Sequence, residues 1–343
     1  MAHVVLDLND LRPVFGRPDW LGDEVRAALP ADWSLAVLDT PAEGTGDGSA
    51  AAHPRVLAEV ADARVYMGFG ISPDVLNAGP GLGWIHTGSA GVGSSLTPEL
   101  RARDLIFTNS AGIHGPPMAE AVLGMILHFS RGFDMAVRSQ ARASWDTEPF
   151  YASNSPLREI AGSTVGILGR GGLGREVADR LRPLGARILG LTRTPGGVPE
   201  GVEGVFGEEG FHRLLAESDF VVVTAPDTPE TRGMMDREAF QRMKPGAVFV
   251  NVARGKIADE TALVDALRTG RLRGAGLDVV AREPLGPDHP LWALDNVLIT
   301  PHVSPVTDRF WRREADLILH HRAAFLAGKP EEMRNVVDVE AGY

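Results

Sequence analysis

The first hundred residues alternate short apolar runs with polar stretches that have helical spacing or turn residues. Each run is short enough for one strand, and each intervening stretch is long enough to return the chain to the same edge. This alternation predicts a small α/β layer of its own. The predicted strands are residues 4–6, 35–38, 65–67, 84–87 and 105–108.

A second and longer series of apolar runs, rich in valine and isoleucine, extends from about residue 165 to residue 300. Unbroken apolar character of this kind is typical of parallel strands that are buried on both faces. It predicts a doubly wound α/β sheet. The strand candidates are residues 164–168, 187–191, 220–223, 247–250, 276–279 and 297–299.

Two helical segments flank this sheet. The segment 119–127 is apolar nearly all round and follows Pro116-Pro117, which suit the start of a helix, so we expect a buried helix there. The segment 309–326 is also helical and should return to the first layer. Because 343 residues exceed the usual size of one core, we expect two domains with a ligand cleft between them. The predicted domains are 1–110 plus 303–343, and 111–302.

A glycine-rich turn follows the first strand of the second series. Residues 173–184 after it carry apolar side chains at three- and four-residue spacing, which predicts a helix, and another strand candidate follows. In such a strand, turn, helix and strand unit, the glycines admit a pyrophosphate to the helix N-terminus. The predicted dinucleotide-binding residues of this turn are Gly169, Arg170, Gly171, Gly172, Leu173 and Gly174.

The end of the next strand decides which dinucleotide binds. An acidic residue there would bind the ribose 2′-hydroxyl of NAD and repel a 2′-phosphate. This sequence instead has Thr192, Arg193 and Thr194, two hydroxyl groups beside a guanidinium that suits a phosphate. We therefore expect NADP(H) to be preferred, with NAD(H) as the alternative if Arg193 is an ordinary solvated arginine.

Composition narrows the function classes. The chain has no cysteine, which excludes disulfides, thiolate catalysis and thiolate zinc sites, and its net charge of -11 disfavours a nucleic-acid partner. No leader pattern and no apolar run of membrane-spanning length is present, so we expect a cytoplasmic enzyme without a membrane partner. No histidine spacing suggests a metal site. His86, His114, His320 and His321 are interpreted as structural or surface residues.

Three polar residues stand just past predicted strands of the second series. Arg254 follows residues 248–253, Glu283 follows residues 277–280, and His302 follows residues 298–301. The carboxyl ends of parallel strands deliver residues to one cleft, so we expect these three to converge. Histidine is the side chain best suited to exchange a proton near neutral pH, which makes the three residues candidates for catalysis.

Through these residues and the motifs around them, the chain resembles the D-isomer-specific 2-hydroxyacid dehydrogenases over nearly its whole length. Matching stretches also include residues 88–93 and 109–123. The motifs that carry the resemblance are GRGGLG at 169–174, VVTAPDTPET at 222–231, NVARG at 251–255, GLDV at 276–279, EPL at 283–285 and TPH at 300–302.

The resemblance implies a Rossmann domain inserted in a smaller flavodoxin-like α/β substrate domain, and it implies roles for individual residues. His302 would be the acid/base, Glu283 its carboxylate partner and Arg254 the substrate anchor. The backbone N–H groups of Ala90, Gly91 and Val92 would bind the substrate carboxylate. Asp278 would hold the nicotinamide carboxamide, and other cofactor contacts would come from Ala225, Pro226, Thr231 and Val252.

The implied activity is reduction of a small 2-oxoacid to the D-hydroxyacid, with glyoxylate or hydroxypyruvate as first substrates to test. A short-form phosphoglycerate dehydrogenase stays open, although the chain lacks room for the regulatory domain of the long forms. A scaffold resembling the dinucleotide-sensing corepressors is the alternative outside enzymes. Formate dehydrogenases carry glutamine at the position of Glu283, which disfavours that activity. Thr224 and residues 303–305 depart from the common pattern.

The resemblance also implies a homodimer built through the cofactor domains. Residues 139–150, which include Trp145, are a candidate partner contact, with a simple surface loop as the alternative. The loop 67–70 and Trp311 are candidates for shaping the substrate pocket, which the sequence does not specify further.

Overall fold

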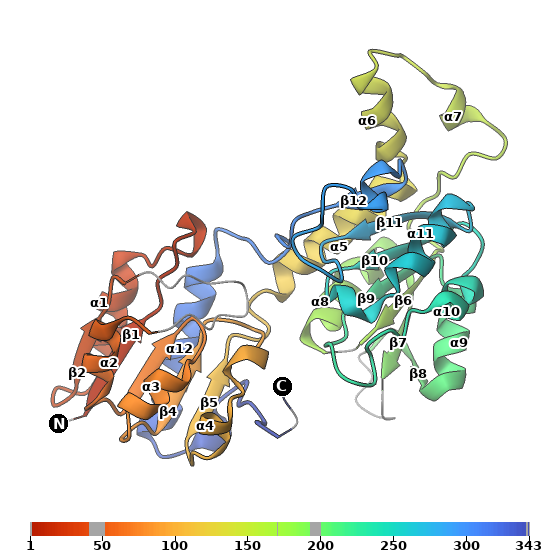
Figure 1. The fold of residues 1–343 in the computed structure, drawn as a ribbon. Helices are drawn as coiled ribbons and strands as arrows, with labels where there is room; N and C mark the ends of the chain where they lie inside the picture. The colour runs from red at the N-terminus through yellow and green to blue at the C-terminus, as the bar shows by residue number, and fades with distance from the viewer. Residues whose placement is uncertain (1, 41–51, 170, 193–199, 341, 343) are drawn as a thin grey trace. The chain divides into compact units, whose positions relative to one another are not determined.

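The computed structural model describes residues 2–40, 52–169, 171–192, 200–340 and 342 (Figure 1). The chain forms two compact units. Unit 1 consists of Met1–His114 and Val306–Tyr343, and unit 2 is the inserted segment Gly115–Pro305. These limits differ from the expected domain boundaries by four residues at the first crossing and three at the second.

Among the described residues of unit 1, five parallel strands form one sheet in the order β2-β1-β3-β4-β5. This is the flavodoxin-like order, in which the chain reverses direction between β1 and β3. The strands are β1 (His3–Asp7), β2 (Ser34–Val37), β3 (Val65–Gly68), β4 (Trp84–Thr87) and β5 (Ile106–Asn109).

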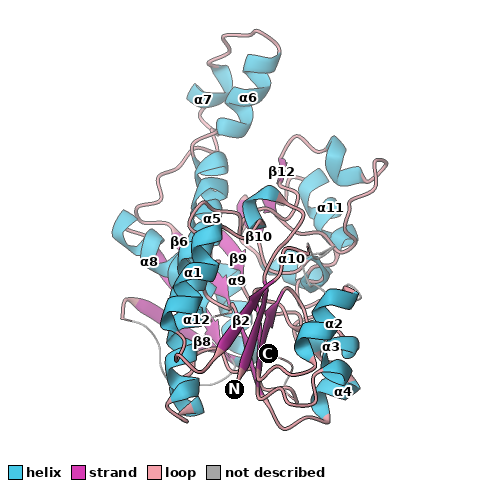
Figure 2. Cartoon of the chain, turned by 90° about the vertical axis from the view of Figure 1, so that its left-hand side faces the viewer, coloured by secondary structure: helices cyan, strands magenta, loops and turns pink. Residues whose placement is uncertain are grey.

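Helices cover both faces of the unit 1 sheet (Figure 2). Val4 and Leu6 of β1 pack with the helices on one face, whereas Val5 between them packs on the other, because successive side chains of a strand point to opposite sides. The first face carries α1 (Asp19–Ala28) and α12 (Phe310–Leu326), and the second carries α2 (Pro54–Val60), α3 (Pro73–Ala78) and α4 (Pro98–Arg101).

The described part of unit 2 contains a sheet of seven parallel strands in the order β12-β11-β10-β9-β6-β7-β8. Counted within the unit, this is the doubly wound Rossmann order, with the direction reversing between β6 and β9. The predicted fold class is confirmed. The strands are β6 (Thr164–Leu168), β7 (Arg187–Thr192), β8 (Val202–Phe206), β9 (Phe220–Val223), β10 (Ala247–Asn251), β11 (Leu272–Leu277) and β12 (Val297–Ile299).

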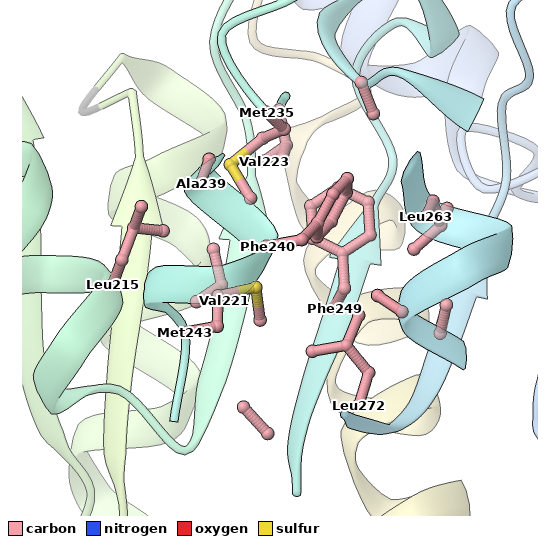
Figure 3. Close-up of a cluster of buried hydrophobic side chains, with 14 of the residues drawn as sticks. Leu215, Val221, Val223, Met235, Ala239, Phe240, Met243, Phe249, Leu263 and Leu272 are labelled. Atoms are coloured by element: carbon pink, nitrogen blue, oxygen red, sulfur yellow. The ribbon is translucent and has the colours of Figure 1, made fainter. Parts of the chain in front are cut away.

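Two apolar clusters hold the helices of unit 2 to its sheet. One lies under α5 (Gly115–Ser130) and α8 (Gly172–Leu181). The other, drawn in Figure 3, lies under α9 (Gly207–Glu217), α10 (Arg237–Arg242) and α11 (Glu260–Arg268). At its centre Phe240 of α10 meets Phe249 of β10 edge to face, with ring centroids 5.3 Å apart. This packing holds α10 against β10.

Three local predictions were wrong. The apolar pattern does not predict β8, an edge strand in which a glutamate and a glycine interrupt the apolar run and only Val205 is buried. The helix after the glycine turn ends at Leu181, and a 3-10 turn containing Pro183 follows, because proline lacks the N–H that would continue the helix. The strand expected at residues 276–279 is β11, which ends at Leu277 and leaves Asp278 just past it.

Candidate active site

The glycine turn between β6 and α8 is shaped by two close backbone approaches. Gly169 has a φ of 101°, and a Cβ there would lie 2.6 Å from the backbone of Ala225. A Cβ on Gly174 would lie 2.2 Å from the carbonyl oxygen of Gly169. Both positions therefore require glycine. At Gly171 and Gly172, in contrast, a Cβ would meet no atom of the described residues within 4 Å, so none of these residues closes the outer side of the turn.

This outer side is the N-terminus of α8. Gly171 provides no side-chain cap, and the first turn of the helix holds no acidic residue. The first N–H groups of a helix have no intrahelical acceptor, and the helix dipole adds partial positive charge there. The turn therefore fits the pyrophosphate of a dinucleotide. Leu173, beside it, is half-buried, and Arg170 lies outside the described residues.

Of the polar residues predicted near this turn, the structure describes Thr192 and Thr224. Thr192 is the last residue of β7, whereas Arg193 and Thr194 lie outside the described residues. After β9, the Thr224 hydroxyl donates to the carbonyl oxygen of Gly169 at 2.5 Å. Thr224, which departs from the common family pattern, thus connects the segment after β9 to the glycine turn.

The segment after Thr224 turns back on itself. The Thr231 hydroxyl donates to the Pro226 carbonyl oxygen at 2.6 Å and accepts the Thr228 N–H at 2.8 Å. Ala225 is buried against Gly169. Thr231 therefore fixes the shape of this turn, whatever further contact it makes with a cofactor.

Arg254 stands on a loop fixed from both sides. Asn251, the last residue of β10, accepts the Ala253 N–H at 3.1 Å through its side-chain oxygen and donates to the Arg254 carbonyl oxygen at 3.0 Å. A Cβ on Gly255 would lie 1.9 Å from the carbonyl carbon of Val280, so the two backbones touch. The loop that carries Arg254 is thereby held directly against the loop after β11.

The side chains of His302 and Glu283 form a hydrogen-bonded pair. The His302 Nδ1 atom lies 2.8 Å from Glu283 Oε2, and the two side chains are 38% and 39% exposed. Glu283 is itself held by the Val280 N–H, which donates to Oε1 at 3.3 Å. Because Nδ1 faces the carboxylate, Nε2 is the ring nitrogen left to meet a ligand. This is the geometry of an oriented acid/base histidine.

Strand register explains why the three loops meet at one edge. Asn251 of β10 pairs with Leu277 of β11, and Leu277 pairs with Ile299 of β12. Arg254 and His302 each follow their paired residue by three positions and Glu283 by six. The predicted arrangement of Arg254, Glu283 and His302 at the carboxyl edge of one sheet is what the structure shows, although their roles stay predictions.

Two other predicted cofactor residues are buried. Val252 is 1% exposed and belongs to the apolar cluster under α5 and α8, so its side chain packs in the core. Asp278 is also 1% exposed, and its carboxylate accepts hydrogen bonds from Thr300, Val303 and Ser304. No sequence pattern predicts these contacts, although Thr300 belongs to the motif that ends in His302.

In unit 1, residues 90–92 lie on the loop after β4. Asn109 supports this loop by donating to the Ala90 carbonyl oxygen at 2.8 Å. Within the described residues, the main-chain N–H groups of Ala90, Gly91 and Val92 donate no hydrogen bond. Three consecutive amide groups of this kind fit an anion such as a carboxylate.

The pocket-shaping candidates of unit 1 belong to one aromatic cluster. Phe69, from the loop after β3, lies 6.2 Å from Trp311 and 6.3 Å from Phe310, centroid to centroid.

The four histidines that were expected to be structural or surface residues each have a contact within unit 1. His86 pairs with Glu314 in the core, and His321 is buried beside it. His114 stacks on Phe310, and His320 donates to the Glu332 carbonyl oxygen.

Neither a metal cluster nor a membrane span is evident in the part of the chain that the structure describes. No group of three or more histidine, aspartate or glutamate side chains there is arranged to hold a metal ion. No described helix is both long and apolar enough to cross a bilayer.

Comparison with known proteins confirms the resemblance seen in the motifs. The family described as D-isomer specific 2-hydroxyacid dehydrogenase, NAD binding domain, matches residues 123–304, which is more than half of the chain. A D-3-phosphoglycerate dehydrogenase of Mycobacterium leprae is 34% identical over 275 residues, which cover 79% of this chain. The match spans only 50% of that longer relative.

Two solved structures match the chain from end to end. A D-isomer specific 2-hydroxyacid dehydrogenase from Xanthobacter autotrophicus, in complex with NADPH and MES, is 32% identical with a TM-score of 0.79 and covers 100% of this chain and 99% of its own. An NADPH-dependent glyoxylate/hydroxypyruvate reductase from Sinorhizobium meliloti, in complex with NADP and sulfate, is 29% identical with a TM-score of 0.76, and each chain is covered in full. The chain therefore belongs to the D-isomer specific 2-hydroxyacid dehydrogenases, a family of NAD(P)-dependent oxidoreductases.

Proposed function

We propose that this protein reduces small 2-oxoacids such as glyoxylate or hydroxypyruvate to D-2-hydroxyacids and prefers NADPH. The observation that carries the proposal is the 2.8 Å pair of His302 and Glu283, held on the same sheet edge as Arg254 in a unit that also contains the glycine turn. The S. meliloti reductase, which matches over the whole chain, supports the substrate class.

In the proposed reaction, each residue of the trio has one task. The bound nicotinamide supplies the hydride that is delivered to C2 of the 2-oxoacid. His302 donates the proton from Nε2 to the carbonyl oxygen, while Glu283 at Nδ1 orients the ring. Arg254 anchors the carboxylate and polarises the carbonyl, because its guanidinium can donate to two oxygens at once.

The loop of Ala90, Gly91 and Val92 is our candidate for a second contact to the substrate carboxylate. Support comes from its three N–H groups, which lack acceptors within the described residues. Unit 1 would accordingly be the substrate domain and unit 2 the dinucleotide domain. Leu173, Ala225, Pro226, Thr231 and the backbone of Val252 would contact the cofactor around the glycine turn.

The preference for NADPH rests on the residues at the end of β7. Thr192 ends that strand, and Arg193 and Thr194 follow it without an acidic residue. An arginine there would bind the 2′-phosphate of NADPH, whereas an acid would repel it. The structures of the X. autotrophicus and S. meliloti relatives hold NADPH and NADP, which agrees with this preference.

We also infer a homodimer in which α6 (Phe133–Ala141) and α7 (Glu148–Tyr151) provide a contact. These helices project from the body of unit 2 (Figure 1) and expose large apolar side chains. Trp145 between them is 96% exposed, and Tyr151 is 86% exposed. Apolar side chains gathered on a projecting segment are typical of an interaction site.

The cytoplasmic location of the protein stays a prediction.

A panel of 2-oxoacids assayed with NADPH and with NADH tests the proposal. We expect NADPH oxidation with glyoxylate or hydroxypyruvate, and the glycerate formed from hydroxypyruvate should have the D configuration, whereas the glycolate formed from glyoxylate is achiral. The His302→Gln variant is the matched control. Tight NADPH binding without turnover of any 2-oxoacid would favour a corepressor-like scaffold. Turnover restricted to phosphohydroxypyruvate would favour a short-form phosphoglycerate dehydrogenase.

A further inference from the structure

Asp278 accepts hydrogen bonds from residues that precede and follow His302 in the sequence. The Thr300 hydroxyl donates to Oδ1 at 2.5 Å, and the Val303 N–H donates to the same oxygen at 2.9 Å. The Ser304 N–H donates to Oδ2 at 3.0 Å. The main-chain carbonyl oxygen of Asp278 also accepts the His302 N–H at 2.9 Å. One buried residue thus holds the turn of residues 300–304 at four points.

This turn needs such support because of the backbone at His302. Its φ is 54°, in the left-handed region that residues other than glycine adopt uncommonly, although histidine adopts it more often than most. A strained conformation of this kind persists only where the surroundings over-determine it, and such residues gather at functional sites. Within the described residues, the carboxylate of Asp278 is the side chain whose bonds to Thr300, Val303 and Ser304 supply that constraint.

We propose that Asp278 is a positioning residue for His302: its carboxylate sets the turn that presents the imidazole to Glu283 and to substrate. This inference rests on the proposed acid/base role of His302. It differs from the nicotinamide contact that the family resemblance implies for Asp278. A carboxylate has about four acceptor positions, and three are taken by the turn.

Two substitutions remove the contacts in steps. Asp278→Asn keeps one acceptor oxygen but points an NH2 group at a backbone N–H, so at least one donor loses its partner. Thr300→Val removes only the hydroxyl, and Thr300→Ser restores it. Asp219→Asn is the control, because Asp219 also accepts a backbone N–H, from Thr164 at 2.9 Å, and pairs with Arg158 and Lys244, but stands at the amino edge of the sheet.

The experiment combines amide hydrogen exchange at Val303 and Ser304 with steady-state kinetics and NADPH titration of the full-length protein. For Asp278→Asn we expect exchange at these two amides to become at least about 10-fold faster. The kcat for glyoxylate should fall about 100-fold, while the Kd for NADPH changes less than about two-fold. Thr300→Val should shift both readouts in the same direction by less, and Thr300→Ser should reverse the shift.

Two results would overturn the proposal. One is unchanged exchange at Val303 and Ser304 with a raised Kd for NADPH, which would assign Asp278 to the cofactor. The other is an equal effect of Asp219→Asn on exchange and kcat, which would indicate general loosening of the unit. The exchange measurement needs no turnover, so it judges this inference even if the proposed 2-oxoacid reduction fails.

Discussion

Two alanine substitutions in the glycine turn separate its cofactor-binding role from its structural role. At Gly171, φ is -67° and a Cβ would meet no atom within 4 Å in the part of the chain that the structure describes, so alanine fits there. We expect Gly171→Ala to change the free energy of unfolding by less than about 0.5 kcal/mol. At Gly174, a Cβ would lie 2.2 Å from the Gly169 carbonyl oxygen, so the turn must shift.

The two variants should therefore differ in the free energy of unfolding, although both should bind NADPH more weakly than the wild-type protein does. Overpacking against backbone costs about 1–3 kcal/mol, and we expect Gly174→Ala to lose free energy of unfolding in that range. In Gly171→Ala, the added methyl group would occupy the space assigned to the pyrophosphate. Losing one hydrogen bond to a charged phosphate costs about 1.5–3 kcal/mol, which corresponds to an NADPH Kd raised about 10- to 100-fold.

NADPH fluorescence titration and urea unfolding without cofactor measure the two quantities independently. The stability of Gly171→Ala should match that of the wild-type protein, while its affinity for NADPH falls. If Gly171→Ala binds NADPH as tightly as the wild-type protein does, the pyrophosphate does not lie at the N-terminus of α8, and the reasoning from the outer side of the turn is refuted.

Three further predictions concern single side chains. Arg193→Ala should raise the KM for NADPH at least about 10-fold and leave that for NADH nearly unchanged, because only NADPH carries the 2′-phosphate; an equal loss for both cofactors contradicts the preference. Glu283→Gln should lower kcat about 10- to 100-fold with a smaller change in KM, since glutamine does not stabilise a charged imidazole; unchanged kcat contradicts its role. Burial, with the nearby charge of His86 second, lowers the pKa of His321 from 6.5 to about 3. The unfolded chain therefore takes up a proton on His321 before the folded chain does as the pH falls below 6.5. At pH 4.5 the free energy of unfolding should be about 3 kcal/mol lower than at pH 8 on account of this residue. Urea unfolding of the wild-type and His321→Gln proteins at pH 8 and 4.5 measures this loss separately from the contribution of Asp7. Burial raises the pKa of Asp7 to about 6, so the folded chain takes up that proton first and Asp7 stabilises the fold as the pH falls.

Both sheets could be predicted because their strands are apolar runs that need two covered faces. Val165, Ile188 and Val250, for example, are each 1% exposed or less. β8 could not be predicted, since an edge strand buries little and its sequence lacks that pattern. The three loops at the carboxyl edge of unit 2 were also predictable, because parallel topology places the ends of neighbouring strands together.

The contacts that fix those loops were not predictable. The touch between Gly255 and Val280 depends on β10 and β11 being neighbours in a particular register, which single-sequence patterns do not give. The bonds from Val303 and Ser304 to Asp278 depend on the left-handed backbone of His302. Neither feature has a sequence signature apart from the glycine itself.

The most direct measurement of the proposed chemistry compares NADPH oxidation by glyoxylate or hydroxypyruvate in the wild-type and His302→Gln proteins, together with NADPH titration of both. Removing an acid/base group costs about 100- to 10,000-fold in rate, so we predict a kcat reduced into that range with an NADPH Kd within about two-fold of wild type. A His302→Gln protein with full activity would contradict the role of the His302–Glu283 pair.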